Sequence, residues 1–306
     1  MGTIKHFVII AVMLSFIMSC QANKQNFKQK PLIFTSIYPI EFIVERLTED
    51  FARSQSIFPP GVDAHTYEPT IKDIMSIAEG EAFFFLGEGM EGSADKISQA
   101  LHDSPVKIIE IAKYPEIFID SMDDQEHDDH SHGDFDPHIW FDPERMITLS
   151  EIVKDELNEL FPEEHELIVN NFHQLTEELV ELDNQFQRRL QVKENPSIIV
   201  SHAAYGYWEH KYNIKQIPIS GMSSTDEPSQ KALAHLVEIA NEQNIEYVLF
   251  EKTTSNRLAT IVQEEIDANA LYIHNLETLL PEDIKQNKDY FSLMRENLNT
   301  IDQATK

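Results

Sequence analysis

Residues Glu163–Leu190, EEHELIVNNFHQLTEELVELDNQFQRRL, predict one long amphipathic helix with no internal Gly or Pro. Its apolar residues recur at steps of four or three and form a single stripe, which consists of Ile168, Phe172, Leu175, Leu179, Leu182, Phe186 and Leu190. At ~1.5 Å per residue the helix would be about 40 Å long, enough to span two domains. Coiled-coil oligomerisation is the competing interpretation. We favour burial of the stripe along two flanking domains, which predicts a monomer.

Short apolar runs alternate with helical patterns on both sides of this helix, which is typical of βα units and a largely parallel sheet. The predicted strands are Leu32–Thr35, Ser56–Phe58, Ala82–Leu86 and Val106–Ile109, then Ser197–Val200, Lys215–Ile217, Tyr247–Phe250 and Ala270–Ile273. The predicted helices are Ile40–Asp50, Thr70–Glu79, Ser93–Leu101, Glu144–Leu160, Ser229–Gln243, Asn256–Ala268 and Asp289–Asp302. We therefore predict an α/β fold of two lobes, residues 31–142 and 196–306, bridged by a rigid connector of helices in residues 143–195.

The N-terminus predicts export and a lipid anchor. The apolar run Phe7–Met18 follows a basic start and is too short to cross a membrane, but it has the length of a signal-peptide core. It leads into Ile17-Met18-Ser19-Cys20, which resembles a bacterial lipobox. An ordinary secretory signal is the alternative. We expect a signal peptide over 1–19, lipidation at Cys20 and a polar tether over 20–30. The protein would then be extracytoplasmic and anchored to the cell membrane, in the periplasm where the source has an outer membrane.

Composition limits the classes of partner. The 306 residues include 53 Asp and Glu against 24 Lys and Arg, a formal charge of −29. This excess argues against nucleic acid as a partner, because nucleic acid binding needs a basic surface, and leaves cations as possible ligands. The apolar fraction of 42% is enough for real cores and excludes wholesale disorder. The single cysteine excludes an internal disulfide and a cysteine-based metal site.

Potential metal ligands lie just after predicted strands. His65, His202 and Glu277 each follow a strand, and His138 lies in a turn-rich stretch before the connecting helices. Ligands bind beyond the carboxyl ends of the strands in open α/β sheets, so two residues from each half can meet in one cleft between the lobes. Three imidazoles and one carboxylate suit tetrahedral Zn²⁺.

Several motifs, in order along the chain, resemble the metal-binding lipoproteins of bacterial zinc/manganese ABC importers, the solute-binding proteins of cluster A-I. They are Gly61–Thr70, Asp136–Pro143, Ser201–Tyr207, Ile219–Met222, Asp226–Ser229 and Phe250-Glu251. The resemblance covers essentially the whole mature chain. It implies two α/β lobes bridged by a long helix, no enzymatic activity, and partnership with a separate membrane permease and its ATPase.

The same resemblance implies that His65, His138 and His202 are three ligands of the transported ion. The segment Ile273–Leu279 is similar to the C-terminal ligand loop of the family, with Glu277 at the carboxylate position. Because His274 and Asn275 depart from the commoner form of this loop, the fourth ligand could be Glu277, water or His274.

Two features favour zinc over manganese. His202 stands where the manganese carriers of the family generally have a carboxylate, and imidazole suits zinc whereas carboxylate and water suit manganese. The acidic stretch Asp123–Asp136 also contains His127, His130 and His132. Short His-rich tracts are typical of metal binding, so we expect a surface loop with weak secondary zinc sites. The alternative for this stretch is a solvated acidic loop with incidental histidines.

We therefore predict a high-affinity extracytoplasmic zinc-binding protein that delivers Zn²⁺ to an ABC permease. A manganese-binding homologue is one alternative, and a zinc-dependent hydrolase is another, since three histidines with an exchangeable fourth ligand also describe a catalytic zinc. The sequence contains no His-Glu-x-x-His motif and no Gly-x-Ser-x-Gly motif, which argues against hydrolysis. Cell adhesion remains a possible secondary role. No P-loop motif occurs, so ATP hydrolysis is assigned to a partner.

Overall fold

The structure, a computed structural model, describes residues 30–87, 89–118, 135–253 and 257–305. The predicted signal peptide 1–19, Cys20, almost all of the tether 20–30, and the loop histidines His127, His130 and His132 lie outside the described residues. Among the helices that are described, none combines the length and the hydropathy needed to cross a membrane.

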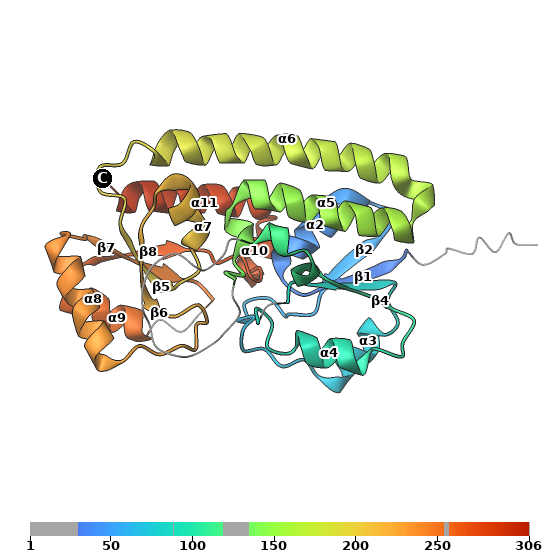
Figure 1. Cartoon of the computed structure of the whole chain (residues 1–306), viewed down its shortest axis with the longest axis horizontal. Helices are drawn as coiled ribbons and strands as arrows, with labels where there is room; N and C mark the ends of the chain where they lie inside the picture. The colour runs from blue at the N-terminus through green and yellow to red at the C-terminus, as the bar shows by residue number, and fades with distance from the viewer. Residues whose placement is uncertain (1–29, 88, 119–134, 254–256, 306) are drawn as a thin grey trace, which may run out of the picture. The chain divides into compact units, whose positions relative to one another are not determined.

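The first half of the chain forms a four-stranded parallel sheet in the order β2-β1-β3-β4 (Figure 1). The strands are β1 (Leu32–Thr35), β2 (Arg53–Ser56), β3 (Ala82–Phe85) and β4 (Lys107–Glu110). The helices that connect them are α2 (Tyr38–Thr48), α3 (Ile71–Ile77) and α4 (Ala94–Ala100). Strand β3 reads Ala-Phe-Phe-Phe and is buried throughout, as expected of a central strand in a parallel sheet covered on both faces.

Strand β2 differs from the sequence prediction of Ser56–Phe58. The strand is Arg53–Ser56, and the apolar pair Ile57-Phe58 lies beyond its end, in the core. The residues of this edge strand are polar and alternately exposed and half-buried, so the strand has no apolar run. The apolar pattern therefore indicates the neighbouring buried residues instead of the strand itself.

The second half repeats the same arrangement, with a parallel sheet in the order β6-β5-β7-β8. The strands are β5 (Ile198–His202), β6 (Gln216–Ser220), β7 (Tyr247–Glu251) and β8 (Asn269–Ile273). The helices are α7 (Gly206–Tyr212), α8 (Gln230–Glu242), α9 (Arg257–Glu265), α10 (Pro281–Lys285) and α11 (Tyr290–Ala304). In each sheet the strand order reverses beside the first strand, which is where ligands bind in such folds.

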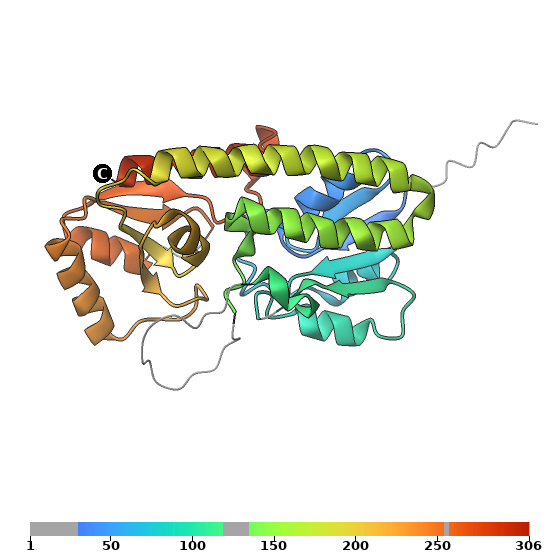
Figure 2. The ribbon, with the colours of Figure 1, turned by 45° about the horizontal axis from the view of Figure 1, so that its top comes forward.

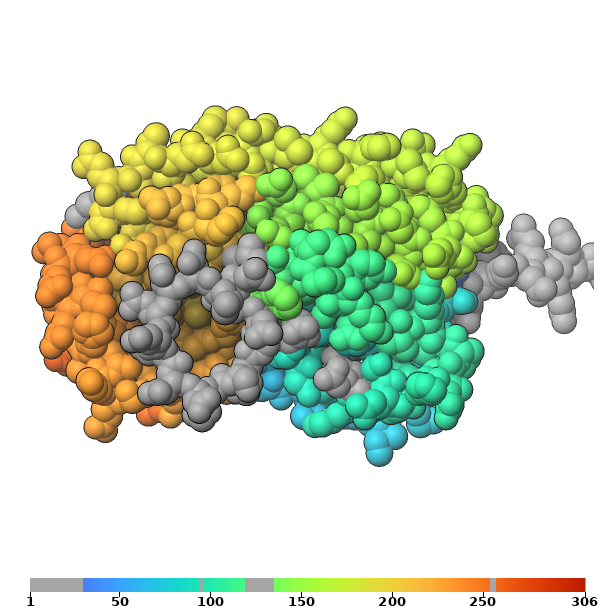
Figure 3. All heavy atoms as spheres, in the orientation of Figure 1, coloured from blue at the N-terminus to red at the C-terminus, as the bar shows by residue number. Residues whose placement is uncertain are grey.

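Two antiparallel helices connect the sheets, α5 (Pro143–Leu160) and α6 (His165–Leu190), with a 3₁₀ turn at Pro162–Glu164 between them. The turn explains why α6 begins two residues later than predicted. Figures 1 and 2 show α6 passing over elements of both halves, and Figure 3 shows its atoms as one continuous band above them. Helix α6 is tied to the first half by the ion pair between Arg46 and Glu178 (2.6 Å), and to the second by that between Arg189 and Asp302 (2.6 Å).

The predicted stripe of α6 is buried inside the chain, with Phe172 half-buried and the other six residues at most 1% exposed. One large hydrophobic core runs from β1 and β3 through α5 and α6 to α11, where Phe42 of α2 stacks on Tyr290 with ring centroids 5.3 Å apart. The stripe is therefore used within one chain and is not available for a coiled coil. The predicted fold class, two α/β lobes bridged by a long helix, is confirmed.

Candidate metal centre

Four side chains from both halves converge between the two lobes. Each of them offers one ligand atom, and these four atoms all lie within 4.8 Å of one another. We call this group the His₃Glu cluster, and its members are His65, His138, His202 and Glu277. His138 and Glu277 are fully buried, and His202 is 1% exposed. All four residues named from the sequence as the metal site are thus brought together.

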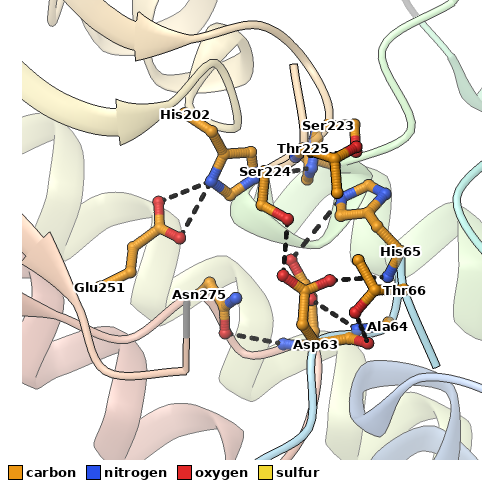
Figure 4. A network of polar contacts seen from close by, with 12 residues as sticks. Asp63, Ala64, His65, Thr66, His202, Ser223, Ser224, Thr225, Glu251 and Asn275 are labelled. Carbon is orange, nitrogen blue, oxygen red and sulfur yellow. Dashed lines mark hydrogen bonds and ion pairs between the residues drawn. The ribbon is translucent and has the colours of Figure 1, made fainter. Parts of the chain in front are cut away.

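Buried hydrogen bonds orient two of the imidazole rings. His138 Nδ1 donates to Asp136 Oδ1 (2.8 Å), and the same oxygen accepts the His138 backbone N–H (2.9 Å). His202 stands at the end of β5, and its Nδ1 donates to Glu251 Oε1 (2.8 Å) at the end of β7 (Figure 4). Since each Nδ1 is used in this way, each Nε2 faces the cluster, and the two Nε2 atoms lie 3.3 Å apart.

The third imidazole comes from the turn between β2 and α3. A hydrogen bond to the backbone of Met90 engages the His65 side chain, and the His65 backbone N–H donates to Asp63 Oδ1 (2.9 Å). His65 Nε2 is buried, lacks a hydrogen-bond partner among the described residues, and lies 3.8 Å from Glu277 Oε1. All three histidines therefore present the same ring nitrogen to one point.

The carboxylate is placed by a strained loop. Leu276, just before Glu277, has a positive φ of 61°, which is uncommon for a residue with a large side chain. The loop is held because the Leu276 N–H donates to His274 Nδ1 (2.9 Å), while His274 Nε2 donates to Asp283 Oδ2 (3.0 Å). Both nitrogens of His274 are thus occupied, and His274 is not in the cluster. The geometry favours Glu277 over His274 as the fourth donor.

The same loop belongs to the second half of the chain but is bonded to the first. The Glu277 carbonyl accepts the backbone N–H of Tyr38 (2.8 Å), and Thr278 Oγ1 donates to the Val62 carbonyl (2.8 Å). Glu277 Oε2 accepts the Ala64 N–H (3.1 Å), which leaves Oε1 directed at the imidazoles and without a hydrogen-bond partner among the described residues. The position of the carboxylate therefore depends on the contact between the lobes.

The electrostatics of the cluster divide the four groups into two pairs. Burial lowers the pKa of His138, and burial together with the neighbouring imidazoles lowers the pKa of His65 to about 2, so both are neutral at pH 7. Burial acts in the same direction on His202, but the Glu251 carboxylate outweighs it and raises the pKa of His202 to about 9. Burial raises the pKa of Glu277 to about 8. The second pair therefore holds protons that a metal ion would displace.

The donor set fits zinc. His65 Nε2 and Glu277 Oε1 are buried, face each other across the cluster, and have no hydrogen-bond partner within the part of the chain that the structure describes. Such atoms are rare in proteins unless an ion or water satisfies them. Three imidazole nitrogens and one carboxylate oxygen form a four-donor set of the kind that tetrahedral Zn²⁺ takes.

Sequence reasoning assigned no role to the residues that orient the ligands. Asp136 could have been recognised, because an Asp two residues before a His can accept both its backbone and its ring N–H. Glu251 was recognised only as part of the Phe250-Glu251 motif, and its contact with His202 was not predicted. The two residues are 49 positions apart, and the pairing of β5 with β7 brings them together.

Comparisons with known proteins find zinc-uptake proteins among the relatives of this chain. Residues 33–304 match the family described as "ZnuA: Zinc-uptake complex component A periplasmic". The chain is 31% identical over 296 residues to the "Zinc-binding lipoprotein AdcA" of Streptococcus pneumoniae, covering 95% of this chain and 58% of that relative. It is 28% identical to the "High-affinity zinc uptake system protein ZnuA" of Bacillus subtilis, covering 88% of this chain and 86% of the relative. The chain thus spans little more than half of the streptococcal relatives.

Solved structures show the same fold. The Zn(II)-bound ZnuA-like domain of Streptococcus pneumoniae AdcA superimposes with a TM-score of 0.73 at 31% identity, covering 90% of this chain and 99% of that one. A laminin-binding protein of Streptococcus agalactiae, described as having adhesin and metal transporting activity, superimposes with a TM-score of 0.77. Its identity of 22% supports the fold alone.

Proposed function

Because the chain belongs to the family of zinc-uptake complex component A, we propose that it captures Zn²⁺ outside the cytoplasm and delivers it to the permease of an ABC importer. The observation that carries the proposal is the His₃Glu cluster, whose four ligand atoms lie within 4.8 Å of one another in the interior. The family is one of metal-binding transport proteins and not of enzymes. In this proposal Zn²⁺ is cargo, and ATP hydrolysis belongs to a separate subunit.

We assign the ligands as His65 Nε2, His138 Nε2, His202 Nε2 and Glu277 Oε1. His202 and Glu277 must lose their protons before they can bind the ion. His65 and His138 are already neutral and can bind it directly. Asp136 and Glu251 keep the Nδ1 proton of their histidines in place, which orients the lone pair of each Nε2 toward the ion. Three imidazoles among four donors favour Zn²⁺ over Mn²⁺, because imidazole suits zinc. The intrinsic affinity of a given site for the two ions also favours Zn²⁺.

The sharpest test is competitive Zn²⁺ and Mn²⁺ titration of the mature domain. We expect Zn²⁺ to be preferred, and His202→Ala to weaken zinc binding by at least ~100-fold, because one of four donors and the partner of the buried Glu251 are lost together. His235→Ala is the matched control, because His235 is exposed and lies outside the cluster. Preference for Mn²⁺, or unchanged zinc affinity in His202→Ala, would contradict the proposal.

Delivery needs a separate measurement in cells. Zinc uptake from zinc-poor medium should fall in cells that lack this chain, and wild-type protein should restore it whereas His202→Ala should not. Full zinc uptake in cells that lack this chain would contradict the role in import, even if the titration shows tight zinc binding.

We also propose a lipid anchor at Cys20, supported by the lipobox-like residues before it and by the lipoprotein name of the pneumococcal relative. Cys20→Ser should move the protein from the membrane fraction to the soluble extracytoplasmic fraction, because a lipid-modified thioether can no longer form. Equal recovery of both proteins in the membrane fraction would contradict the anchor. The zinc affinity of the mature domain should be the same in both.

A further inference from the structure

The His₃Glu cluster is least enclosed on the side of His65. The side chain of His65 is 5% exposed, against 0% for His138 and Glu277 and 1% for His202. Of the four ligand side chains, that of His65 is therefore the one nearest to solvent. The groups beside this histidine are in a position to control the passage.

Asp63 stands at this point and bridges the lobes. Its Oδ1 accepts the backbone N–H of His65 (2.9 Å), and its Oδ2 accepts the hydroxyl of Ser224 (2.6 Å), a residue 161 positions away in the second lobe (Figure 4). Its negative charge also acts on His202 and Glu277, whose pKa values it raises. Asp63 is thus close to His65, His202 and Glu277, although it offers no ligand atom to the cluster.

Ser224 is presented by a turn that its own hydrogen bonds hold closed. The Ser223 N–H donates to Asp226 Oδ2 (3.0 Å), and the Asp226 N–H donates to the Ser223 carbonyl (3.0 Å). The turn follows β6, whose end residue Ser220 pairs with His202 on β5. The hydroxyl of Ser224 therefore reaches Asp63 from an element that is anchored beside a ligand.

We propose that the Asp63–Ser224 hydrogen bond is an interlobe latch that sets how fast the ion enters and leaves the cluster, an inference that rests on the proposed zinc-binding function. Opening the passage beside His65 requires the two lobes to part at this bond. A bond to a carboxylate is stronger than one between neutral groups, so a single contact can limit the opening. Since neither residue ligates the ion, the bond has similar strength with and without it. The latch therefore changes both rates by one factor and leaves the Kd nearly unchanged.

The test measures two quantities in each variant: the rate of zinc release to an excess of a chelator, and the Kd for zinc by competition. The association rate is the release rate divided by the Kd. Ser224→Ala should speed release and association by about tenfold each, with a Kd within about threefold of wild type. Ser224→Thr keeps the hydroxyl and should restore slow release. Thr225→Ala is the matched control: it removes a hydroxyl from the same turn that bonds to Ser223 Oγ and not to Asp63. Wild-type rates in Ser224→Ala, or equal acceleration in Thr225→Ala, would overturn the latch.

A second measurement keeps the latch separate from the proposed function. In metal-free protein, Ser224→Ala should accelerate amide hydrogen exchange in residues 61–66, whose His65 N–H is bonded to Asp63. Unchanged exchange there would overturn the latch even if zinc binding is tight. Conversely, a wild-type protein that binds Zn²⁺ no better than His202→Ala would refute the zinc-binding function, while the exchange result would still decide whether the latch exists.

Discussion

At the scale of single residues, the cluster is governed by which groups hold protons. Glu251 raises the pKa of His202 to about 9 against the effect of burial, and His202 Nε2 lies 3.3 Å from His138 Nε2. A proton on His202 Nε2 can form a hydrogen bond to Nε2 of the neutral His138. This proton then lies where the ion would bind. Binding is therefore an exchange of Zn²⁺ for protons.

This exchange predicts the pH dependence of zinc affinity. Below a group's pKa the ion must displace its proton, and above the pKa there is none to displace. Affinity should therefore rise from pH 6 to pH 8 by about tenfold per pH unit for each proton displaced, and level off above about pH 9. Competition with a chelator of known pH dependence measures the slope. An affinity that does not change over this range would show that His202 and Glu277 have both already lost their protons before the ion binds.

A matched variant identifies the proton on His202. Glu251→Gln removes the charge that raises the pKa of His202 while retaining a group that can bond to its Nδ1. The affinity of this variant should level off at a lower pH than that of the wild type. The same plateau in both proteins would assign the proton to Glu277 instead.

At the scale of elements, α6 stabilises the fold through one face. Leu182 on the stripe is 0% exposed, whereas Val180 on the same helix is 47% exposed. Helix α6 is paired with α2 through Glu178 and with α11 through Arg189, and the residues of its stripe belong to a core that includes residues of both halves. The contribution of the stripe can be separated from that of the helix itself by changing one residue on each face.

Leu182→Ala should lower the free energy of unfolding by about 2–5 kcal/mol, because it leaves a cavity in a core that cannot collapse fully. Val180→Ala should change it by no more than about 0.5 kcal/mol, since it removes little buried surface. Urea denaturation of both variants measures the difference. Equal effects would mean that the stripe is not a principal support of the fold.

At the scale of the whole molecule, we propose residues 31–142 and 196–306 as the two lobes and 143–195 as the connector. Each parallel sheet falls within one of these ranges, and α5 and α6 fall within the third. The Glu277 loop is bonded across the boundary at Tyr38, Val62 and Ala64, which favours small relative motion of the lobes apart from local opening at the latch.

The capacity of the molecule for zinc should exceed one ion if the His-rich stretch also binds. Deletion of 123–134 should reduce the number of zinc ions bound per chain and leave the affinity of the tight site unchanged, because His65, His138, His202 and Glu277 lie outside it. A full-length variant with His127, His130 and His132 all changed to Asn controls for loop length. Isothermal titration measures both numbers, and loss of tight binding on deletion would place a loop histidine in the primary site.

The α/β class, the long α6 and the family could be predicted from the sequence alone, because periodicity and motif spacing are local properties that one strand or helix carries on its own. The sequence also pointed to His65, His138 and His202, which the structure brings together with Glu277. It misplaced β2, an edge strand whose polar residues lack an apolar pattern. It also left the fourth donor open. Tertiary structure alone favoured Glu277 over His274, since hydrogen bonds from Leu276 and to Asp283 occupy the His274 ring. The contacts of Glu251 with His202 and of Asp63 with Ser224 likewise depend on strand pairing and lobe packing, which bring together residues far apart in sequence.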